Sequence, residues 1–205
     1  MNKFIVFEGP DGCGKTTILD LVENHFKEKG INIVRTREPG GTKLGEEVRK
    51  IALLSQSEIS AMTEAFLMAT SRSQLVDELI EPSLKDAHVL TDRFVPSSLV
   101  YQGIARGLGI EKIKELNDFA LKGLRPDITL YFAIDYESSL ERKQMRGSTD
   151  NIENETEEFH KNIHQGYEMV YNMYKDHYNI VKIDARKEID DVFDQVMEVL
   201  NKGGI

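Results

Sequence analysis

One stretch of the sequence has the residue types and spacing of a loop that binds phosphate groups: Gly9-Pro10-Asp11-Gly12-Cys13-Gly14-Lys15-Thr16-Thr17. It fills every required place of the pattern G-x-x-x-x-G-K-[ST], in which backbone N–H groups surround an anion. The glycines allow backbone conformations that a Cβ would forbid, and the positive end of a following helix adds to the attraction. We expect Lys15 to reach the β- and γ-phosphates and the hydroxyl of Thr16 to hold Mg²⁺. The stretch therefore predicts binding of a nucleoside triphosphate.

A carboxylate and an arginine, Asp92 and Arg93, directly follow another apolar run. In parallel sheets, ligands bind in the crevice outside the carboxyl ends of the strands, which is where this pair would lie. An arginine suits a phosphate because its planar fork donates two hydrogen bonds at once. Asp92 has a second interpretation as the cap of the next helix.

The elements that must position these residues alternate between β-prone runs and helical segments. Five apolar runs predict strands: Phe4–Phe7, Ile31–Arg35, His88–Asp92, Ile128–Ile134 and Ile180–Ile183. Helical patterns occupy the segment after the phosphate loop, Thr63–Lys85, a stretch that ends at Gly123, Glu137–Arg146, Thr156–Tyr174 and Ile189–Leu200. Such alternation predicts an α/β fold, with a parallel sheet covered by helices on both faces.

Size and composition exclude several classes of protein. The chain of 205 residues suits one domain, and its net charge of −9 offers no basic field to nucleic acid or to an anionic membrane. No apolar run approaches the length of a membrane span, and the N-terminus has no signal-peptide pattern. A single cysteine excludes an internal disulfide. We therefore expect a cytoplasmic protein without nucleic-acid or membrane partners.

That cysteine, Cys13, lies inside the phosphate loop. One interpretation is a small side chain at a position where only the backbone matters. The other is a thiol whose pKa is lowered by the helix N-terminus, so that its modification would block nucleotide binding.

A phosphate loop is shared by switches, motors, transporters and small-molecule kinases. A guanine-specific switch would carry [NT]-K-x-D late in the chain and D-x-x-G after the third strand, and the sequence has neither. A motor or helicase needs a longer chain and a more basic surface. The size of the chain therefore favours a small-molecule kinase.

Two further segments narrow this choice. The second strand leads into Thr36-Arg37-Glu38-Pro39-Gly40-Gly41-Thr42, and the third into Asp92-Arg93-Phe94-Val95-Pro96-Ser97-Ser98-Leu99-Val100-Tyr101-Gln102-Gly103. With the phosphate loop, they make the chain resemble the bacterial thymidylate kinases, and the resemblance covers nearly the whole chain. It implies one P-loop kinase domain over residues 1–205, a three-layer α/β/α sandwich with a five-stranded parallel sheet and a helical lid at about residues 142–160. It also implies transfer of the γ-phosphoryl group of ATP to dTMP, giving dTDP and ADP.

The resemblance implies roles around the two phosphates. Asp11 would contact the sugar 3′-hydroxyl of the acceptor, Arg49 would hold its phosphate, and Arg93 would reach the transferred group. Glu38 would lie near Mg²⁺ and the acceptor phosphate, and Asp92 matches the carboxylate that supports Mg²⁺. Two anionic substrates repel each other, and these cations, with the loop lysine and Mg²⁺, offset that repulsion. An acceptor phosphate is already ionised, so we expect no general base.

The resemblance also implies roles around the acceptor base. Arg72 and Gln102 would face the thymine edge with Ser98 close by, and the ring of Tyr101 would crowd out a ribose 2′-hydroxyl. The family carries a stacking aromatic residue where this chain has Met68. Phe66, two residues earlier, would point to roughly the opposite face of the helix. A methionine can lie against a base through its sulfur, and its flexibility predicts a more permissive pocket.

The phosphate loop carries no basic residue at positions 10–13, so a further cation must come from elsewhere. The resemblance implies that the lid supplies it. Arg146 is the first candidate and Arg142, one helical turn earlier, is the second. The alternative is a solvated amphipathic helix.

The residues also allow two other functions. A kinase of another pyrimidine deoxynucleotide, such as dUMP or a 5-substituted dUMP, would fit the permissive pocket. A regulatory ATP-binding module without turnover would keep the same loop. A homodimer is implied by the resemblance alone.

Overall fold

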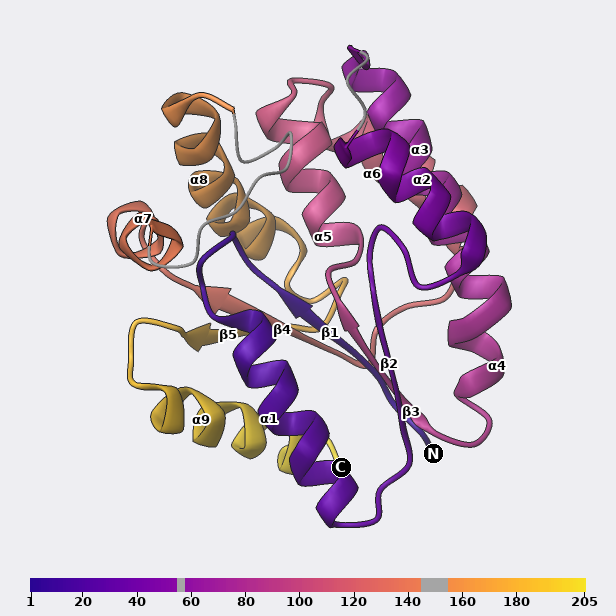
Figure 1. Ribbon diagram of the computed structural model, residues 1–205, viewed down its shortest axis with the longest axis vertical. Helices are drawn as coiled ribbons and strands as arrows, with labels where there is room; N and C mark the ends of the chain where they lie inside the picture. The colour runs from indigo at the N-terminus through magenta and orange to yellow at the C-terminus, as the bar shows by residue number, and fades with distance from the viewer. Residues whose placement is uncertain (55–57, 145–154) are drawn as a thin grey trace.

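The computed structural model describes residues 1–54, 58–144 and 155–205. Its centre is a sheet of five parallel strands in the order β2-β3-β1-β4-β5 (Figure 1). The strands are β1 (Phe4–Glu8), β2 (Ile33–Arg37), β3 (His88–Asp92), β4 (Ile128–Ala133) and β5 (Ile180–Asp184). The five predicted strands are therefore confirmed, with ends shifted by no more than two residues.

Strand β1 shows why the sheet needs helices on both faces. Its alternate side chains enter two cores: Phe4 and Val6 join one, and Ile5 and Phe7 join the other. Strands covered on both faces are apolar throughout, as this one is. The second core lies under α1 (Lys15–Glu28) and α9 (Ile189–Lys202), and the first under α3 (Ala61–Leu75), α6 (Ile110–Leu121) and α8 (Glu157–Tyr174) (Figure 1). The predicted α/β sandwich is confirmed.

The predicted helix Thr63–Lys85 is interrupted. Helix α3 passes into a π-helical turn, η1 (Val76–Ile80), and then into the short α4 (Glu81–Ser83). The N–H of Glu81 donates to the carbonyl of Val76, five residues back, and Pro82 has no N–H with which to continue an α-helical pattern. Helix α2 (Lys43–Leu54) packs on α3 at this side of the molecule.

Two other helical boundaries differ from the sequence prediction. Helix α6 ends at Leu121, before the predicted Gly123, because Lys122 already has a left-handed φ of 50°. The segment after β3 forms α5 (Val95–Ser98) and a π-helical stretch, η2 (Leu99–Ala105), where no helix was predicted. Most of this segment is buried, so it lacks the polar face that reveals a helix in a sequence.

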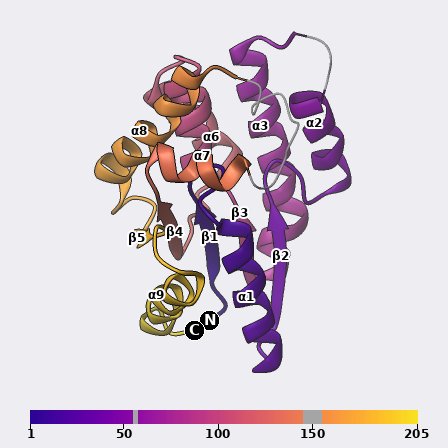
Figure 2. The same cartoon turned by 60° about the vertical axis from the view of Figure 1, so that its left-hand side comes forward.

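Helix α7 (Tyr136–Gln144) follows β4 and lies across the end of the sheet where β1 enters the phosphate loop (Figure 2). The hydroxyl of Ser139 on α7 donates to the carbonyl of Asp11 at 2.6 Å, which ties this helix to the loop. Within the described ranges, every helix is too short or too polar to cross a membrane.

Candidate functional site

A cavity of about 890 Å³ opens at the carboxyl ends of β1, β2 and β3. This is the place where a parallel sheet binds its ligands. Most of the candidate residues from the sequence line it: Pro10, Asp11, Gly12, Gly14, Lys15, Thr16, Glu38, Arg49, Met68, Arg72, Asp92, Arg93, Ser98, Tyr101 and Gln102. The fold thus gathers the phosphate loop and the residues of both later segments around one space.

The phosphate loop leaves β1 through a position that only glycine fits. Gly9 has a φ of 150°, and a Cβ there would lie 2.8 Å from the carbonyl oxygen of Phe132 on β4. Gly14, with a φ of 91°, precedes the first residue of α1. Lys15 is buried, and its Nζ donates to the carbonyls of Gly9 (3.0 Å) and Pro10 (3.2 Å). The ammonium group therefore lies inside the curve of the loop.

Cys13 is buried on the sheet side of the loop and belongs to the core under α1 and α9. Burial raises the pKa of its thiol, and the nearby Lys15 offsets only part of this effect. The structure therefore favours the interpretation of Cys13 as a small packing residue over that of a reactive thiolate.

Arg93 contacts both the phosphate loop and the ring of Tyr101. Its φ of 71° turns the chain sharply after β3, and its guanidinium forms an ion pair with Asp11. Nη1 also donates to the carbonyl of Gly9 at 3.0 Å, and the guanidinium lies 5.1 Å from the ring centre of Tyr101. Tyr101 in turn donates to Asp11 at 3.3 Å. Arg93, Asp11 and Tyr101 thus form one unit.

A buried carboxylate that the sequence did not predict supports this unit. Glu8, the last residue of β1, accepts hydrogen bonds from the N–H of Phe94 (2.7 Å), the hydroxyl of Ser97 (2.6 Å) and that of Tyr167 (3.1 Å). The same two hydroxyls contact Nη1 of Arg93, at 3.1 and 2.9 Å. Burial raises the pKa of Glu8, although these donors stabilise its charge. The one sequence feature that could have indicated Glu8 is its position at the end of β1, directly before the phosphate loop.

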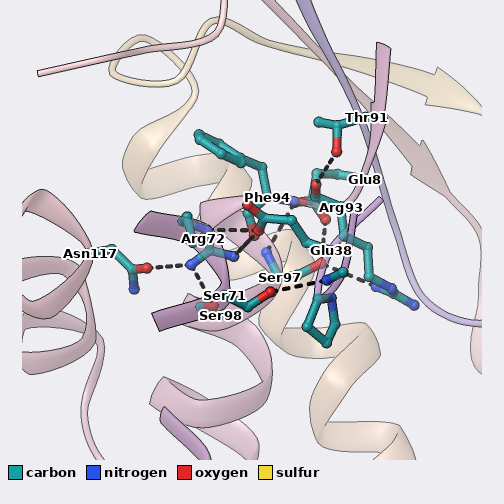
Figure 3. Close-up of polar contacts among 12 residues, drawn as sticks. Glu8, Glu38, Ser71, Arg72, Thr91, Arg93, Phe94, Ser97, Ser98 and Asn117 are labelled. Carbon is teal, nitrogen blue, oxygen red and sulfur yellow. Dashed lines mark hydrogen bonds and ion pairs between the residues drawn. The ribbon is translucent and has the colours of Figure 1, made fainter. Parts of the chain in front are cut away.

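Arg72 is held on every side by acceptors (Figure 3). Its guanidinium pairs with Glu38, with Nε 2.7 Å from Oε2, and donates to the carbonyl of Phe94 at 3.0 Å. Nη1 donates to Ser98 at 2.9 Å and to the Asn117 side chain. Burial raises the pKa of Glu38 to about 7, an effect that Arg72 only partly offsets. Asn117, from α6, was not predicted, since only the tertiary fold brings it to α3.

Two carboxylates of neighbouring strands meet at the edge of the cavity. The N–H of Glu38 donates to the carbonyl of Asp92 at 2.9 Å, because β2 and β3 end side by side. Oδ1 of Asp92 and Oε1 of Glu38 are buried without a hydrogen-bond partner in the described parts of the chain. Thr16, in the first turn of α1, lines the same cavity. The arrangement offers oxygen ligands of the kind that Mg²⁺ prefers.

Met68 lines the cavity and is 8% exposed. Phe66 is 54% exposed, so it lies on a different face of α3 from Met68, as expected. Gln102 also lines the cavity, and its Nε2 donates to Glu64 at 2.7 Å. Glu64 is a further buried residue that the sequence analysis did not select.

Two arginines of the sequence prediction have different surroundings. Arg49 lines the cavity and donates to the carbonyl of Pro39 at 3.0 Å. Arg142 donates to the carbonyl of Ala185 at 2.8 Å, and its Nη1 lies 3.9 Å from where a Cβ on Gly14 would stand. It is therefore beside the phosphate loop. Arg146 lies outside the described residues, as does about half of the predicted lid, at residues 145–154.

A parallel sheet, a phosphate loop at the end of β1 and a cavity rich in arginine define an ATP-dependent phosphotransferase of the P-loop kinase class. A family model described as thymidylate kinase matches residues 7–196. The chain belongs to the thymidylate kinase family, and the resemblance inferred from its motifs is confirmed.

Individual relatives agree with this assignment. A thymidylate kinase of Finegoldia magna is 42% identical over 204 residues, which cover 98% of this chain and 99% of that protein. One of Caldanaerobacter subterraneus subsp. tengcongensis is 45% identical over 201 residues, 98% of this chain and 95% of its own. The crystal structure of thymidylate kinase from Ehrlichia chaffeensis superposes with a TM-score of 0.76 at 30% identity, covering 97% of this chain and 98% of that one. The similarity therefore extends over whole chains.

Proposed function

We propose that the protein transfers the γ-phosphoryl group of ATP to dTMP, giving dTDP and ADP. Family membership supports this function, and so does one observation on the geometry. A single cavity joins the phosphate loop to Arg49, Arg72 and Arg93. A donor and an acceptor phosphate bound there would meet without crossing bulk water, as phosphoryl transfer requires.

We infer that Mg²⁺ would be held by Thr16, Asp92 and Glu38. The two buried carboxylate oxygens without a hydrogen-bond partner in the described residues fit a hard cation. When bound, Mg²⁺ neutralises charge that develops on the phosphoryl oxygens. ADP formation should therefore stop in excess EDTA and return when Mg²⁺ is restored.

The chain's own residues would divide the work of positioning. Lys15 would exchange the carbonyls of Gly9 and Pro10 for phosphate oxygens, which are charged and therefore stronger acceptors. Asp11 and Tyr101 would face the sugar, and Arg93, held by Asp11 and the Gly9 carbonyl, would bridge the two phosphates. Arg49 would bind the acceptor phosphate. No general base is needed, because that phosphate is ionised at neutral pH.

We propose that the acceptor base lies against Met68, with Arg72, Ser98 and Gln102 along its edge. All four residues line the cavity. The alternative acceptor is another pyrimidine nucleotide, dUMP or a 5-substituted dUMP, because the methionine side chain adapts to different surfaces. No comparison favours it, nor does any favour a non-catalytic module.

The test is an ADP-release assay with a panel of acceptors: dTMP, dUMP, 5-hydroxymethyl-dUMP, dCMP and dGMP. We expect Mg²⁺-dependent ADP formation that is fastest with dTMP and lost in Lys15→Ala. Lys27→Ala is the matched control, because Lys27 lies on the same helix, exposed and paired with Glu23 at 2.6 Å. ADP release that is equal with and without any acceptor would contradict the proposal, and tight ATP binding without turnover would favour the regulatory module.

We propose that an arginine of the lid supplies the further cation near the phosphates. Arg146 remains the first candidate on sequence grounds, and Arg142 is the second because it lies beside Gly14. Substitution of each by alanine, followed by kcat and KM for ATP, separates them. Loss of the residue that supplies charge to the transition state should lower kcat. Loss of a residue that only binds ATP should raise KM.

We also propose a homodimer of single-domain chains. Helix α3 packs against both α2 and α6, and these three helices carry exposed apolar side chains: Leu44, Ile51, Leu54, Met62, Phe66 and Phe119. Phe119 is the most exposed of them, at 86%, and several exposed apolar side chains on packed helices suit a protein–protein interface. Light scattering should give twice the chain mass of 23.3 kDa, and Phe119→Glu should lower it. Met173→Glu, on the exposed side of α8, is the control, and an unchanged mass in both variants would exclude this face.

A cytoplasmic location is proposed as well, because the one cysteine of the sequence is unpaired and suits a reducing compartment.

A further inference from the structure

Gln102 is held by a single carboxylate. Its Nε2 donates to Oε1 of Glu64 at 2.7 Å, and both residues are buried. Within the described residues, the Gln102 side chain makes no other hydrogen bond. A carboxylate only accepts hydrogen bonds, so the amide must turn its NH₂ side toward Glu64. Its carbonyl, Oε1, therefore cannot face Glu64.

Glu64 is itself fixed in place. Nε of Arg106 donates to its second oxygen, Oε2, at 3.1 Å. The guanidinium of Arg106 is held in turn by Glu155 at 2.5 Å and lies 4.7 Å from the ring centre of Phe159 on α8. Each oxygen of Glu64 thus has its own donor, one from an amide and one from a charged group. This keeps Glu64 an acceptor toward Gln102.

We propose that Glu64 is a positioning residue that sets the amide orientation of Gln102 and thereby selects the acceptor base. This inference rests on the proposed function, in which Gln102 faces the base. With NH₂ committed to Glu64, the amide offers its carbonyl oxygen as an acceptor and one remaining N–H as a donor. A base with an N–H beside a carbonyl, as at N3 and O4 of thymine or uracil, matches that pair.

Cytosine has the opposite pattern at the same ring positions. Its N3 carries a lone pair and its N4 carries hydrogens, so N3 would face the carbonyl of Gln102 without a hydrogen bond. A free glutamine could rotate by 180° about its last bond and serve cytosine equally well. The contact with Glu64 opposes that rotation, because it would place two acceptors against each other. A fixed amide at a buried site rejects the wrong partner strongly.

The central test is Glu64→Gln, in which the new side chain can either accept from or donate to Gln102. We expect the ratio of kcat/KM for dTMP to kcat/KM for dCMP to fall about tenfold or more, as the loss of one charge-assisted hydrogen bond would allow. The ratio is measured within one preparation, so a partly unfolded sample does not change it. Glu78→Gln, an exposed glutamate that bonds Gln74, is the matched control.

A double variant separates orientation from general damage. In a Gln102→Ala background, Glu64→Gln should leave the ratio unchanged, because no amide remains to rotate. A ratio in Glu64→Gln within twofold of the wild-type value would overturn the inference. So would an equal fall of the ratio with and without Gln102.

An NMR measurement tests the orientation of the Gln102 amide without turnover, so it applies even if the proposed function is wrong. If the wild-type protein ignores dTMP, that function is wrong, and nitrogen-edited NMR of the Gln102 amide decides the inference. An NH₂ proton bound to a carboxylate should shift upfield by a clear amount on Glu64→Gln and stay in place on Glu78→Gln. An NH₂ signal that is the same in all three proteins would overturn the assigned orientation.

Discussion

The hydroxyl of Tyr167 allows a sharp test of how Arg93 is positioned. It contacts Nη1 of Arg93 at 2.9 Å, Ser97 at 2.8 Å and Glu8 at 3.1 Å. Tyr167→Phe removes this oxygen and keeps the ring, which is stacked on Tyr131 with centres 5.5 Å apart. The change therefore reports on hydrogen bonding and leaves the packing of α8 in place.

The expected loss of stability follows from the hydrogen bonds that remain in Tyr167→Phe. Ser97 still donates to Glu8, and Arg93 keeps Asp11, the Gly9 carbonyl and Ser97. The net loss is then that of one hydrogen bond to a charged group, about 2 kcal/mol. For a chain of this length, 1 kcal/mol shifts Tm by about 2–4 °C, so we expect a fall of about 4–8 °C. A less constrained Arg93 should also lower kcat, by up to about tenfold.

The assay compares thermal unfolding of Tyr167→Phe with that of Tyr174→Phe. Tyr174 lies on the same helix, and its hydroxyl donates to exposed Glu111 at 2.7 Å. The control should lose less than about 0.5 kcal/mol, as is usual for surface changes. Equal values of Tm and kcat in the two variants would refute the reasoning, since the buried network would then contribute no more than a solvent-exposed contact.

Four other predictions concern single residues. Gly9→Ala should abolish ATP binding and lower Tm, because its Cβ would lie 2.8 Å from a backbone oxygen; calorimetric binding equal to wild type would contradict this. Met68→Phe should raise the preference for dTMP over dUMP, and an unchanged ratio would show that position 68 does not line the base site. The Cys13 thiol should react with a colorimetric disulfide reagent only on unfolding, because burial raises its pKa; rapid labelling of the native protein would refute this. The ion pair with Arg186 lowers the pKa of Asp184 to about 2, so its native charge is lost only below the usual 3.8; in Arg186→Gln, an NMR titration should move upward toward 3.8, and an unmoved midpoint would exclude the pair as the cause.

The sequence predicted the sheet because its strands are buried on both faces and bounded by turns. The apolar runs of β1 and β4 have no competing helical interpretation, and the phosphate loop fixes where α1 begins. The π-helical stretches could not be predicted in the same way. Leu99 and Val100 are fully buried, so the segment lacks amphipathic periodicity. The turn near Val76 depends on how α3 packs on its neighbours.

For the site, contiguous motifs were informative and isolated partners were not. The residues of the phosphate loop and the Asp92-Arg93 pair could be found because their spacing along the chain carries the geometry. Glu64 and Asn117 act through contacts with residues 38 and 45 positions away along the chain. Such partners are ordinary polar residues of helices until the helices are packed together. Arg72 was predicted from its position in the family motif, but its ion pair with Glu38 was not predicted.

The acidic net charge and the cationic site are compatible because three buried or partly buried cations of the cavity already have acceptors. Arg72 pairs with Glu38, Arg93 pairs with Asp11, and Lys15 donates to two loop carbonyls. These acceptors hold the cationic groups in position at small cost, since a buried charge without partners would be far less stable. Phosphate oxygens are stronger acceptors than carbonyls, so a nucleotide gains from Lys15 without a rearrangement of its backbone. The pairs with Glu38 and Asp11 differ, because those carboxylates would themselves face Mg²⁺ and the acceptor sugar. Binding of the second substrate would then redistribute charge within one connected network, which is how a single cavity can hold two anions at once.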